Sequence, residues 1–341
     1  MNKIDILSST PEELRHEFKH LSIPSYRADQ VFQWIYKKNV SGFNDMANLP
    51  SSLREKLSKK YYFQPIKIKD RLESNDGTKK FLFELSDKKV IETVLIHSYK
   101  RDTICLSTQV GCKFGCNFCA SGMKGFVRDL SPTEIVSQIL YILKHTNKKI
   151  DNYVFMGMGE PLDNYDNLER AITIMNSSWG LEIGARRMTV STCGIIPGID
   201  RLKDLNIQVN LSISLHAANN KLRDSLVPIN NTYPIEELIK SCRGFMKKKG
   251  RIITLEYILI KDKNDSEKDI KELSKIAKTL NAKVNLIPYS FVEGYKLTSP
   301  TRKDVENFES ALTRKRISVT VRRSKGGDIQ AACGQLAMRN L

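Results

Sequence analysis

"TICLSTQVGCKFGCNFCAS", residues 103–121, joins a segment rich in β-formers to a loop that holds three cysteines. Cys112, Cys116 and Cys119 have the spacing C-x3-C-x2-C, and no fourth cysteine follows nearby. Structural zinc sites take four protein ligands, commonly from two cysteine pairs, and iron–sulfur clusters normally take four thiolates. A metal centre built on this loop therefore lacks one protein ligand.

From Thr103 onward, strand candidates alternate with helix candidates in about six repeats. The first repeat pairs a strand over 103–110 with a helix over 131–145, for which Ser131 is the predicted N-cap and Glu134 closes a capping box. Such alternation predicts parallel strands with helices outside, in an open or closed barrel. Chemistry in these folds gathers at the loops after the carboxyl ends of the strands, where the cysteine loop lies.

Two other segments precede the repeats, and one follows them. Residues 1–62 are predicted to form a small helical unit, because apolar residues recur at helical spacing in "PEELRHEFKHL" and "SYRADQVFQWIYKK". Three strand candidates follow within 63–97, with "NDG" as a turn between the first two. The repeats occupy 98–325, and a tail over 326–341 begins with two glycines and carries the isolated Cys333.

The charge of the chain indicates a polyanionic partner. Its 341 residues include 55 Lys plus Arg against 38 Asp plus Glu, a formal charge of +17. Phosphate contacts release counterions, so this excess favours nucleic acid. No apolar run approaches the roughly 20 residues of a membrane helix, and the first residues lack the apolar core of a signal peptide. We therefore expect a cytoplasmic protein, in which seven cysteines indicate metal binding or catalysis rather than a disulfide framework.

The missing ligand of the cysteine loop can be a small molecule. S-adenosylmethionine (SAM) offers an amine and a carboxylate to an open iron, and its sulfonium yields a 5′-deoxyadenosyl radical when it accepts one electron. The cysteine spacing, on a loop after the first strand of the repeats, resembles that of the radical SAM superfamily. "MGMGEP", residues 156–161, resembles its glycine–glutamate motif, in which Glu160 accepts hydrogen bonds from the cofactor's ammonium. A zinc site completed by His97 or His216 is the alternative.

Over essentially the whole chain, the sequence resembles the radical SAM methyltransferases that modify adenosine in ribosomal RNA. The resemblance lies in "QVGCKFGCNFCASGMKGFVRDL", "FMGMGEPLDN", "RRMTVSTCGIIP", "ISLHAANNKLRDSLVPIN", "VNLIPYS" and "DIQAACGQL". Pro161 and "GFVRDL" are similar to the branch that methylates adenine C2 in 23S rRNA and tRNA, whereas the alternative branch acts at C8. The resemblance implies an α/β fold, a partial (βα)6 radical-SAM barrel over 98–325. It adds an RNA-binding helical accessory domain (1–62), a short β segment (63–97) and a catalytic tail (326–341).

The resemblance also implies a mechanism with two further thiols. Cys333 takes a methyl group from one SAM, and the radical from a second SAM removes a hydrogen from that methyl. The resulting carbon radical adds to adenine C2, and a base, Glu92 or Cys105, removes the C2 proton. Cys105 then attacks the sulfur of Cys333, which releases the methylated base and leaves a disulfide. From the residues alone, a core role for Cys105 and an exposed, non-catalytic Glu92 stay open. Cys193 and Cys242 match no functional cysteine of the family.

The implied cofactors are one [4Fe–4S] cluster, bound by Cys112, Cys116 and Cys119, and two SAM molecules per turnover. The implied SAM contacts are Gly159, Glu160, Ser191, Ser214, Leu215, His216 and Asn285. The implied partners are 23S rRNA, tRNA and a reductant such as flavodoxin or ferredoxin, and we expect a monomer. Arg322, Arg323 and Lys325 offer phosphate contacts. An RNA-binding protein with a purely structural cluster remains the alternative from another class.

Overall fold

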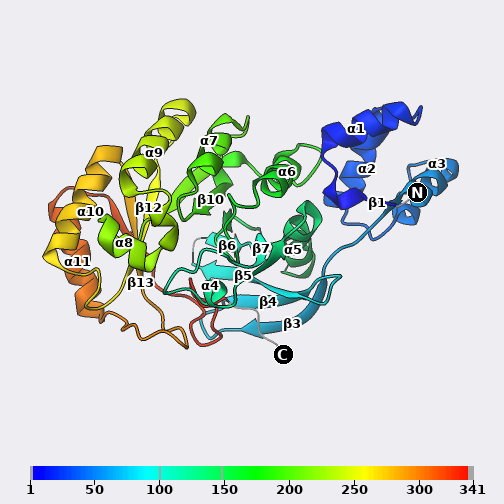
Figure 1. The fold of residues 1–341 in the computed structure, drawn as a ribbon. Coiled ribbons are helices and arrows are strands. Elements are labelled where there is room, and N and C mark those ends of the chain that lie inside the picture. The colour runs from blue at the N-terminus through cyan, green and yellow to red at the C-terminus, as the bar shows by residue number, and fades with distance from the viewer. Residues whose placement is uncertain (1–2, 100, 147–148, 337–341) are drawn as a thin grey trace.

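In the described residues (3–99, 101–146 and 149–336), a ten-stranded sheet forms the centre of the computed structural model (Figure 1). The neighbouring strands follow the order β14-β13-β12-β11-β10-β9-β6-β5-β4-β3. The parallel part consists of β6 (Arg101–Cys105), β9 (Asn152–Phe155), β10 (Met188–Thr192), β11 (Asn210–Ser214), β12 (Thr254–Leu259), β13 (Lys283–Pro288) and β14 (Val319–Val321). The carboxyl ends of these strands therefore meet along one edge.

Helices between these strands cover the outer face of the curved sheet (Figure 1). They are α5 (Pro132–Thr146), α6 (Tyr165–Asn176), α7 (Ile196–Asp204), α8 (Asn220–Leu226), α9 (Ile235–Lys249), α10 (Glu267–Leu280) and α11 (Arg302–Arg314), with short 3-10 turns at Ala185–Arg187 and Pro228–Asn231. The predicted capping box of α5 is confirmed, because the Glu134 N–H donates to Ser131 Oγ (3.2 Å) and the Ser131 N–H donates to Glu134 Oε2 (2.9 Å). The predicted α/β architecture of strand–helix repeats is likewise confirmed.

Three antiparallel strands, which we call the β extension, continue the same sheet beyond the barrel. They are β3 (Lys67–Glu73), β4 (Lys79–Glu84) and β5 (Val90–Ser98), and the predicted turn "NDG" joins the first two. Strand β5 pairs with β6, so that Val94 lies opposite Cys105. The segment 63–97 is thus continuous with the barrel sheet.

The predicted strand over 103–110 is divided in two. Strand β6 ends at Cys105, and after a bend β7 (Gln109–Gly111) pairs with β8 (Phe126–Asp129) in a separate two-stranded sheet. The N–H groups of Thr108 and Gln109 both donate to the carbonyl oxygen of Met158, which fixes the bend. The cysteine loop, residues 112–119, lies between β7 and the short helix α4 (Ala120–Met123).

The first residues form a separate helical unit (Figure 1). Its helices are α1 (Pro11–His20), α2 (Tyr26–Tyr36) and α3 (Ser51–Lys60), with 3-10 turns at Ile6–Ser8 and Phe43–Asp45. Strands β1 (Ile4–Asp5) and β2 (Tyr61–Tyr62) pair in parallel and close the two ends of the unit. Residues 1–2 of the predicted accessory domain and 337–341 of the predicted tail lie outside the described residues. Within the described chain, no helix has the length and apolar character that crossing a membrane requires.

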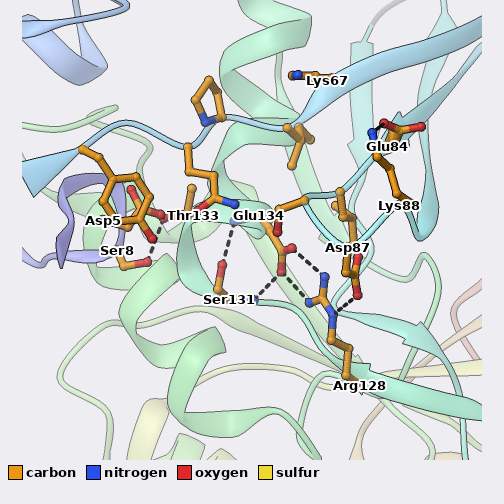
Figure 2. A pocket seen from close by; sticks show the side chains of 16 residues that line it. Asp5, Ser8, Lys67, Glu84, Asp87, Lys88, Arg128, Ser131, Thr133 and Glu134 are labelled. Carbon is orange, nitrogen blue, oxygen red and sulfur yellow. Dashed lines mark hydrogen bonds and ion pairs between the residues drawn. The ribbon is translucent and has the colours of Figure 1, made fainter. Parts of the chain in front are cut away.

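A cleft of about 610 Å³ lies where the helical unit, the β extension and the barrel meet (Figure 2). Thr133 Oγ1 donates to Asp5 Oδ2 (2.5 Å) on one side of the cleft. On the other side, the guanidinium of Arg128 donates to both carboxylate oxygens of Glu134 (2.8 and 2.9 Å) and to Asp87 Oδ2 (2.8 Å). These pairs join all three parts of the chain.

Candidate active site

The cysteine loop is held in a compact turn by backbone hydrogen bonds. The Cys112 N–H donates to the carbonyl oxygen of Gly125 (3.0 Å), and the Cys119 N–H donates to that of Cys116 (3.1 Å). Gly111 precedes the loop with φ +77°, and a Cβ there would overlap the carbonyl oxygen of Gly125. Glycine is therefore required at the position from which the loop starts.

The three cysteines of the loop line one cavity of about 150 Å³, which we call the cluster cavity. Burial raises the pKa of Cys112 to about 12 and that of Cys116 well above its usual value. These thiols need a bound cation to ionise, and three sulfur donors in one cavity fit an iron–sulfur cluster. Polar and charged residues complete the walls, among them Glu160, Ser191, Ser214, His216, Glu256, Arg322 and Cys333.

The zinc alternative finds less support in this geometry. His97 hydrogen-bonds with Asp102 Oδ1 (2.6 Å) at the amino end of β6, whereas the cysteine loop follows the carboxyl end. Among the described residues, no three His, Cys, Asp or Glu side chains converge on a point where one metal ion would sit. Cluster ligands bind different iron atoms, so three thiols can share a cavity without converging.

Glu160 joins the ends of several strands at the wall of the cluster cavity. Its two carboxylate oxygens accept hydrogen bonds from the N–H groups of Leu162 (3.0 Å) and Cys193 (2.8 Å), and its own N–H donates to Gln109 Oε1 (2.8 Å). Burial raises the pKa of this carboxyl. Gly159 has φ +96°, and a Cβ there would lie 2.5 Å from Gln109 Cβ. Packing against Gln109 therefore requires glycine at this position.

Ser191, Ser214 and His216 place polar atoms on the same wall, at the carboxyl ends of β10 and β11. The hydroxyl oxygens of Ser191 and Ser214 lie 3.3 Å apart. His216 Nδ1 accepts a hydrogen bond from the Ile258 N–H (3.1 Å), and its ring meets Phe118 edge-on. Burial lowers the pKa of His216 to about 3, so the imidazole is neutral at physiological pH.

Two of the implied SAM contacts do not line the cluster cavity. Leu215 is buried in the core. Asn285 lines a second cavity, of about 910 Å³, on the side of the barrel where the strands begin. Asn285 Nδ2 donates to Glu256 Oε2 (2.6 Å), and Glu256 lines both cavities. Asn285 is therefore linked to the cluster cavity through this carboxylate.

Arg223 is a fully buried cation that the sequence did not single out. Its guanidinium donates to the carbonyl oxygens of Leu215 (3.1 Å), Cys193 (2.6 Å) and Ser214 (3.2 Å), and to Asn230 Oδ1 (2.8 Å). It thus fixes the backbone after β10 and β11, from which the polar groups of the cavity project. Only its place in "HAANNKLRDSL", a block shared with the family, marked this arginine.

Cys105 and Cys333, separated by most of the barrel in sequence, line one small cavity of about 70 Å³. Cys119 and Arg322 line it too, so this cavity adjoins the cluster cavity. Burial, and then the charge of Cys333, raises the pKa of Cys105 to about 12. Arg322, Arg323 and Lys325, which we expected to contact phosphate, all line this small cavity, and Arg322 also lines the cluster cavity.

Glu92 lies apart from the lining of both cavities. It is 1% exposed and forms an ion pair with Lys80 Nζ (3.4 Å), which is equally buried. The Ser107 hydroxyl donates to the backbone carbonyl of Glu92 (2.5 Å). The alternative of an exposed strand glutamate is therefore wrong, because Glu92 is buried beneath the tail.

Comparison with known proteins identifies the family. A model of the Radical SAM superfamily matches residues 106–274, and one of the ribosomal RNA large subunit methyltransferase N-terminal domain matches 4–62. A probable dual-specificity RNA methyltransferase RlmN from Dictyoglomus turgidum is 47% identical over 97% of this chain and 96% of its own length. The chain belongs to the RlmN family. A relative of the same name from Clostridium novyi is 44% identical over 97% of each chain.

Among solved structures, a radical SAM methyltransferase from Sphaerobacter thermophilus matches with a TM-score of 0.92 and 40% identity, over 98% of this chain and all of that one. This confirms the predicted radical SAM fold with an N-terminal accessory part. Membership of the RlmN family also confirms the expected cofactors, a [4Fe–4S] cluster with three cysteine ligands and SAM. The three thiols of the cluster cavity agree with that requirement.

Proposed function

We propose that this protein methylates C2 of a specific adenosine in the peptidyl-transferase region of 23S rRNA, and of an adenosine beside the tRNA anticodon. The observation that carries the proposal is the meeting of Cys105 and Cys333 in one cavity beside the cysteine loop. A methyltransferase that passes an electrophilic methyl group directly from SAM to its substrate needs neither thiol. Adenine C2 resists electrophilic methylation, and in this mechanism one thiol carries the methyl group while the other releases the methylated base.

The residues of the cluster cavity bind and orient the cofactors. Cys112, Cys116 and Cys119 would hold the cluster, which with bound SAM supplies the 5′-deoxyadenosyl radical. The carboxylate of Glu160 can accept hydrogen bonds from the amine of SAM. The hydroxyls of Ser191 and Ser214, at the carboxyl ends of β10 and β11, can donate to the carboxylate of SAM. Gly159, Leu215 and His216 shape the backbone around them, and Asn285 acts through Glu256.

Cys333 carries the methyl group, and Cys105 attacks its sulfur to release the product and leave a disulfide. Burial raises the pKa of Cys105 to about 12, so it must lose its proton before it can accept the C2 proton or attack the sulfur of Cys333. Glu92 is the other candidate to accept the C2 proton. An external one-electron reductant such as flavodoxin or ferredoxin supplies the electron for cofactor cleavage, and the disulfide must be reduced before the next turnover. The net charge of +17 suits both RNA substrates, and we assign RNA-backbone binding to residues 1–62 of a monomeric, cytoplasmic enzyme.

Nucleoside analysis tests the proposal. The protein, reconstituted without oxygen, receives SAM, a one-electron donor and unmethylated 23S rRNA or tRNA, and the digested RNA is separated by chromatography with mass detection. 2-Methyladenosine supports the proposal, and 8-methyladenosine would place the enzyme in the C8 branch. Cys333→Ala should abolish methylation while it keeps the cluster. Cys242→Ala, a buried cysteine in α9, is the matched control and should keep both.

A further inference from the structure

The tail, residues 326–336 as described, runs back from the end of the barrel across the β extension (Figure 1, red beside the cyan strands and α4). The Ala331 N–H donates to the carbonyl oxygen of Gly326 (2.8 Å), and the Gln330 N–H donates to that of Gly327 (3.2 Å). The start of the tail is therefore a closed loop with its own hydrogen bonds rather than an extended strand.

This loop is bound to the turn between β3 and β4. Asp328 accepts hydrogen bonds from the Ser74 hydroxyl (2.6 Å) and the Asn75 N–H (3.2 Å). In the opposite direction, Asp76 Oδ2 accepts from the Gly326 N–H (3.0 Å). A carboxylate from each side thus binds backbone N–H of the other, which fixes the register of the two turns.

A buried lysine continues this contact toward the barrel. Lys80 Nζ donates to the carbonyl oxygen of Gln330 (3.2 Å) and forms the ion pair with Glu92. Both charged side chains are at most 2% exposed. The tail therefore covers a buried ion pair, and its backbone supplies one oxygen to the ammonium.

The two glycines of the tail differ in their surroundings. Gly326 has φ +66°, and a Cβ there would lie 2.9 Å from both Ala331 Cβ and Thr78 Cγ2. Gly327 is exposed, and a Cβ there would meet nothing within 4 Å. The contact with the β3–β4 turn therefore requires glycine at 326 but not at 327.

The other end of the tail is bound to the helix that follows the cysteine loop. The Ala120 N–H donates to the carbonyl oxygen of Gly334 (2.7 Å), and the Ser121 hydroxyl donates to that of Leu336 (2.6 Å). Both donors come directly after Cys119. The same short helix therefore contacts the tail and carries a cluster ligand.

We propose that the β3–β4 turn, with Lys80, and the start of α4 form a two-sided dock that sets the position of Cys333. The cysteine lies between the two anchored stretches, two residues after Ala331 and directly before Gly334, so the anchors restrict its position from both sides. This inference rests on the proposed role of Cys333 as methyl carrier. It gives the β extension a task in catalysis, and it makes Gly326 and Asp328 positioning residues.

The glycine pair gives a matched test on the holoenzyme. Gly326→Ala should raise the rate of hydrogen–deuterium exchange in the peptide 326–336 about tenfold, because alanine at positive φ is strained and collides with Thr78. Gly327→Ala should leave that rate unchanged. Equal exchange in the two variants would overturn the dock.

Product ratios separate positioning from loss of folded enzyme. If the dock positions Cys333, Gly326→Ala should form several times more 5′-deoxyadenosine per methylated adenosine than Gly327→Ala, because cofactor cleavage continues while methyl delivery fails. A parallel fall of both products, with the ratio unchanged, would overturn the positioning role. If the wild type gave no methyladenosine at all, the proposed function would fail, yet the exchange experiment would still decide the dock.

Asp328 provides an independent variant that spares the backbone. Asp328→Ala removes both hydrogen bonds to the turn, whereas Asp328→Asn keeps one acceptor oxygen. Exchange in the tail should increase in the order wild type, Asn, Ala. Asp70→Ala, on the exposed face of β3, is the control and should match the wild type. Wild-type exchange in Asp328→Ala would contradict the proposed anchor.

Discussion

Replacing Arg223 with methionine should destabilise the whole barrel, because three of the four oxygens that its guanidinium binds belong to buried residues, Cys193, Leu215 and Asn230. The two shortest hydrogen bonds go to the Cys193 carbonyl (2.6 Å) and Asn230 Oδ1 (2.8 Å). A buried acceptor left without a donor costs about 1–3 kcal/mol. Methionine keeps most of the volume and relieves the burial of a cation, so we expect a net loss of about 2–4 kcal/mol. That is a large part of the roughly 5–15 kcal/mol that stabilises a typical protein.

Urea denaturation of the anaerobic protein, followed by far-ultraviolet circular dichroism, measures this loss. Arg243→Met is the matched control, because Arg243 is exposed on α9 and its replacement should change the free energy of unfolding by less than about 0.5 kcal/mol. The backbone that Arg223 holds also carries Ser214, so SAM should bind more weakly to the Arg223 variant. A loss below 1 kcal/mol, equal to that of the control, would refute the reasoning.

Three further outcomes follow from burial. Cys105, with its pKa raised to about 12 by burial, should stay unalkylated by iodoacetamide at pH 8 while the half-buried Cys333 reacts, as peptide mass mapping would show. The free energy of unfolding should fall as the pH drops from about 6.5 to about 3, because His216 takes up its proton only in the unfolded chain, and His216→Asn should flatten this part of a urea-denaturation pH series. Gly157→Ala should cost about 2 kcal/mol of unfolding free energy, because its Cβ would lie 2.6 Å from a backbone carbonyl oxygen, whereas Gly184→Ala, with open space, should cost nothing.

Each of these outcomes has a result that would contradict it. Equal alkylation of Cys105 and Cys333 would show that the carboxyl end of β6 is open to solvent. A pH series identical in wild type and His216→Asn would mean that the imidazole titrates in the folded protein as it does in water. Equal stability of Gly157→Ala and Gly184→Ala would mean that the backbone at Leu106 moves aside at no cost in free energy.

Local signals in the sequence predicted the elements well. The capping box at Ser131 and the regular apolar spacing of segments such as 267–280 depend only on neighbours within a turn or two, so they survive in the fold. The cysteine spacing is also a local signal, because the ligands of one cluster can come from one loop, and the three cysteines do line one cavity. The strand over 103–110 was misjudged because its break depends on Met158, which arrives from the next repeat.

The long-range environment of charged residues was not predictable from the sequence. Arg322 and Arg323 are adjacent and both line the thiol cavity, yet Arg322 is partly buried and also lines the cluster cavity, whereas Arg323 is exposed. The difference arises because β14 joins the edge of the sheet beside β13, where the Arg322 N–H donates to the carbonyl oxygen of Leu286 (2.8 Å). Lys80 and Glu92 likewise look like surface residues until the tail covers them.

The hydrogen bond between Ser74 and Asp328 spans 254 residues of the chain. During synthesis, the β3–β4 turn leaves the ribosome long before the segment that it binds. Because domains begin to fold as the chain emerges, the barrel and the cysteine loop can form before the tail has been synthesised and bound to the dock. An unfinished or clipped chain that lacks only the tail would therefore keep its three loop cysteines but lose Cys333, the methyl carrier proposed above. Under the proposed mechanism, completion of the polypeptide supplies the methyl carrier to a barrel that already contains the cysteine loop.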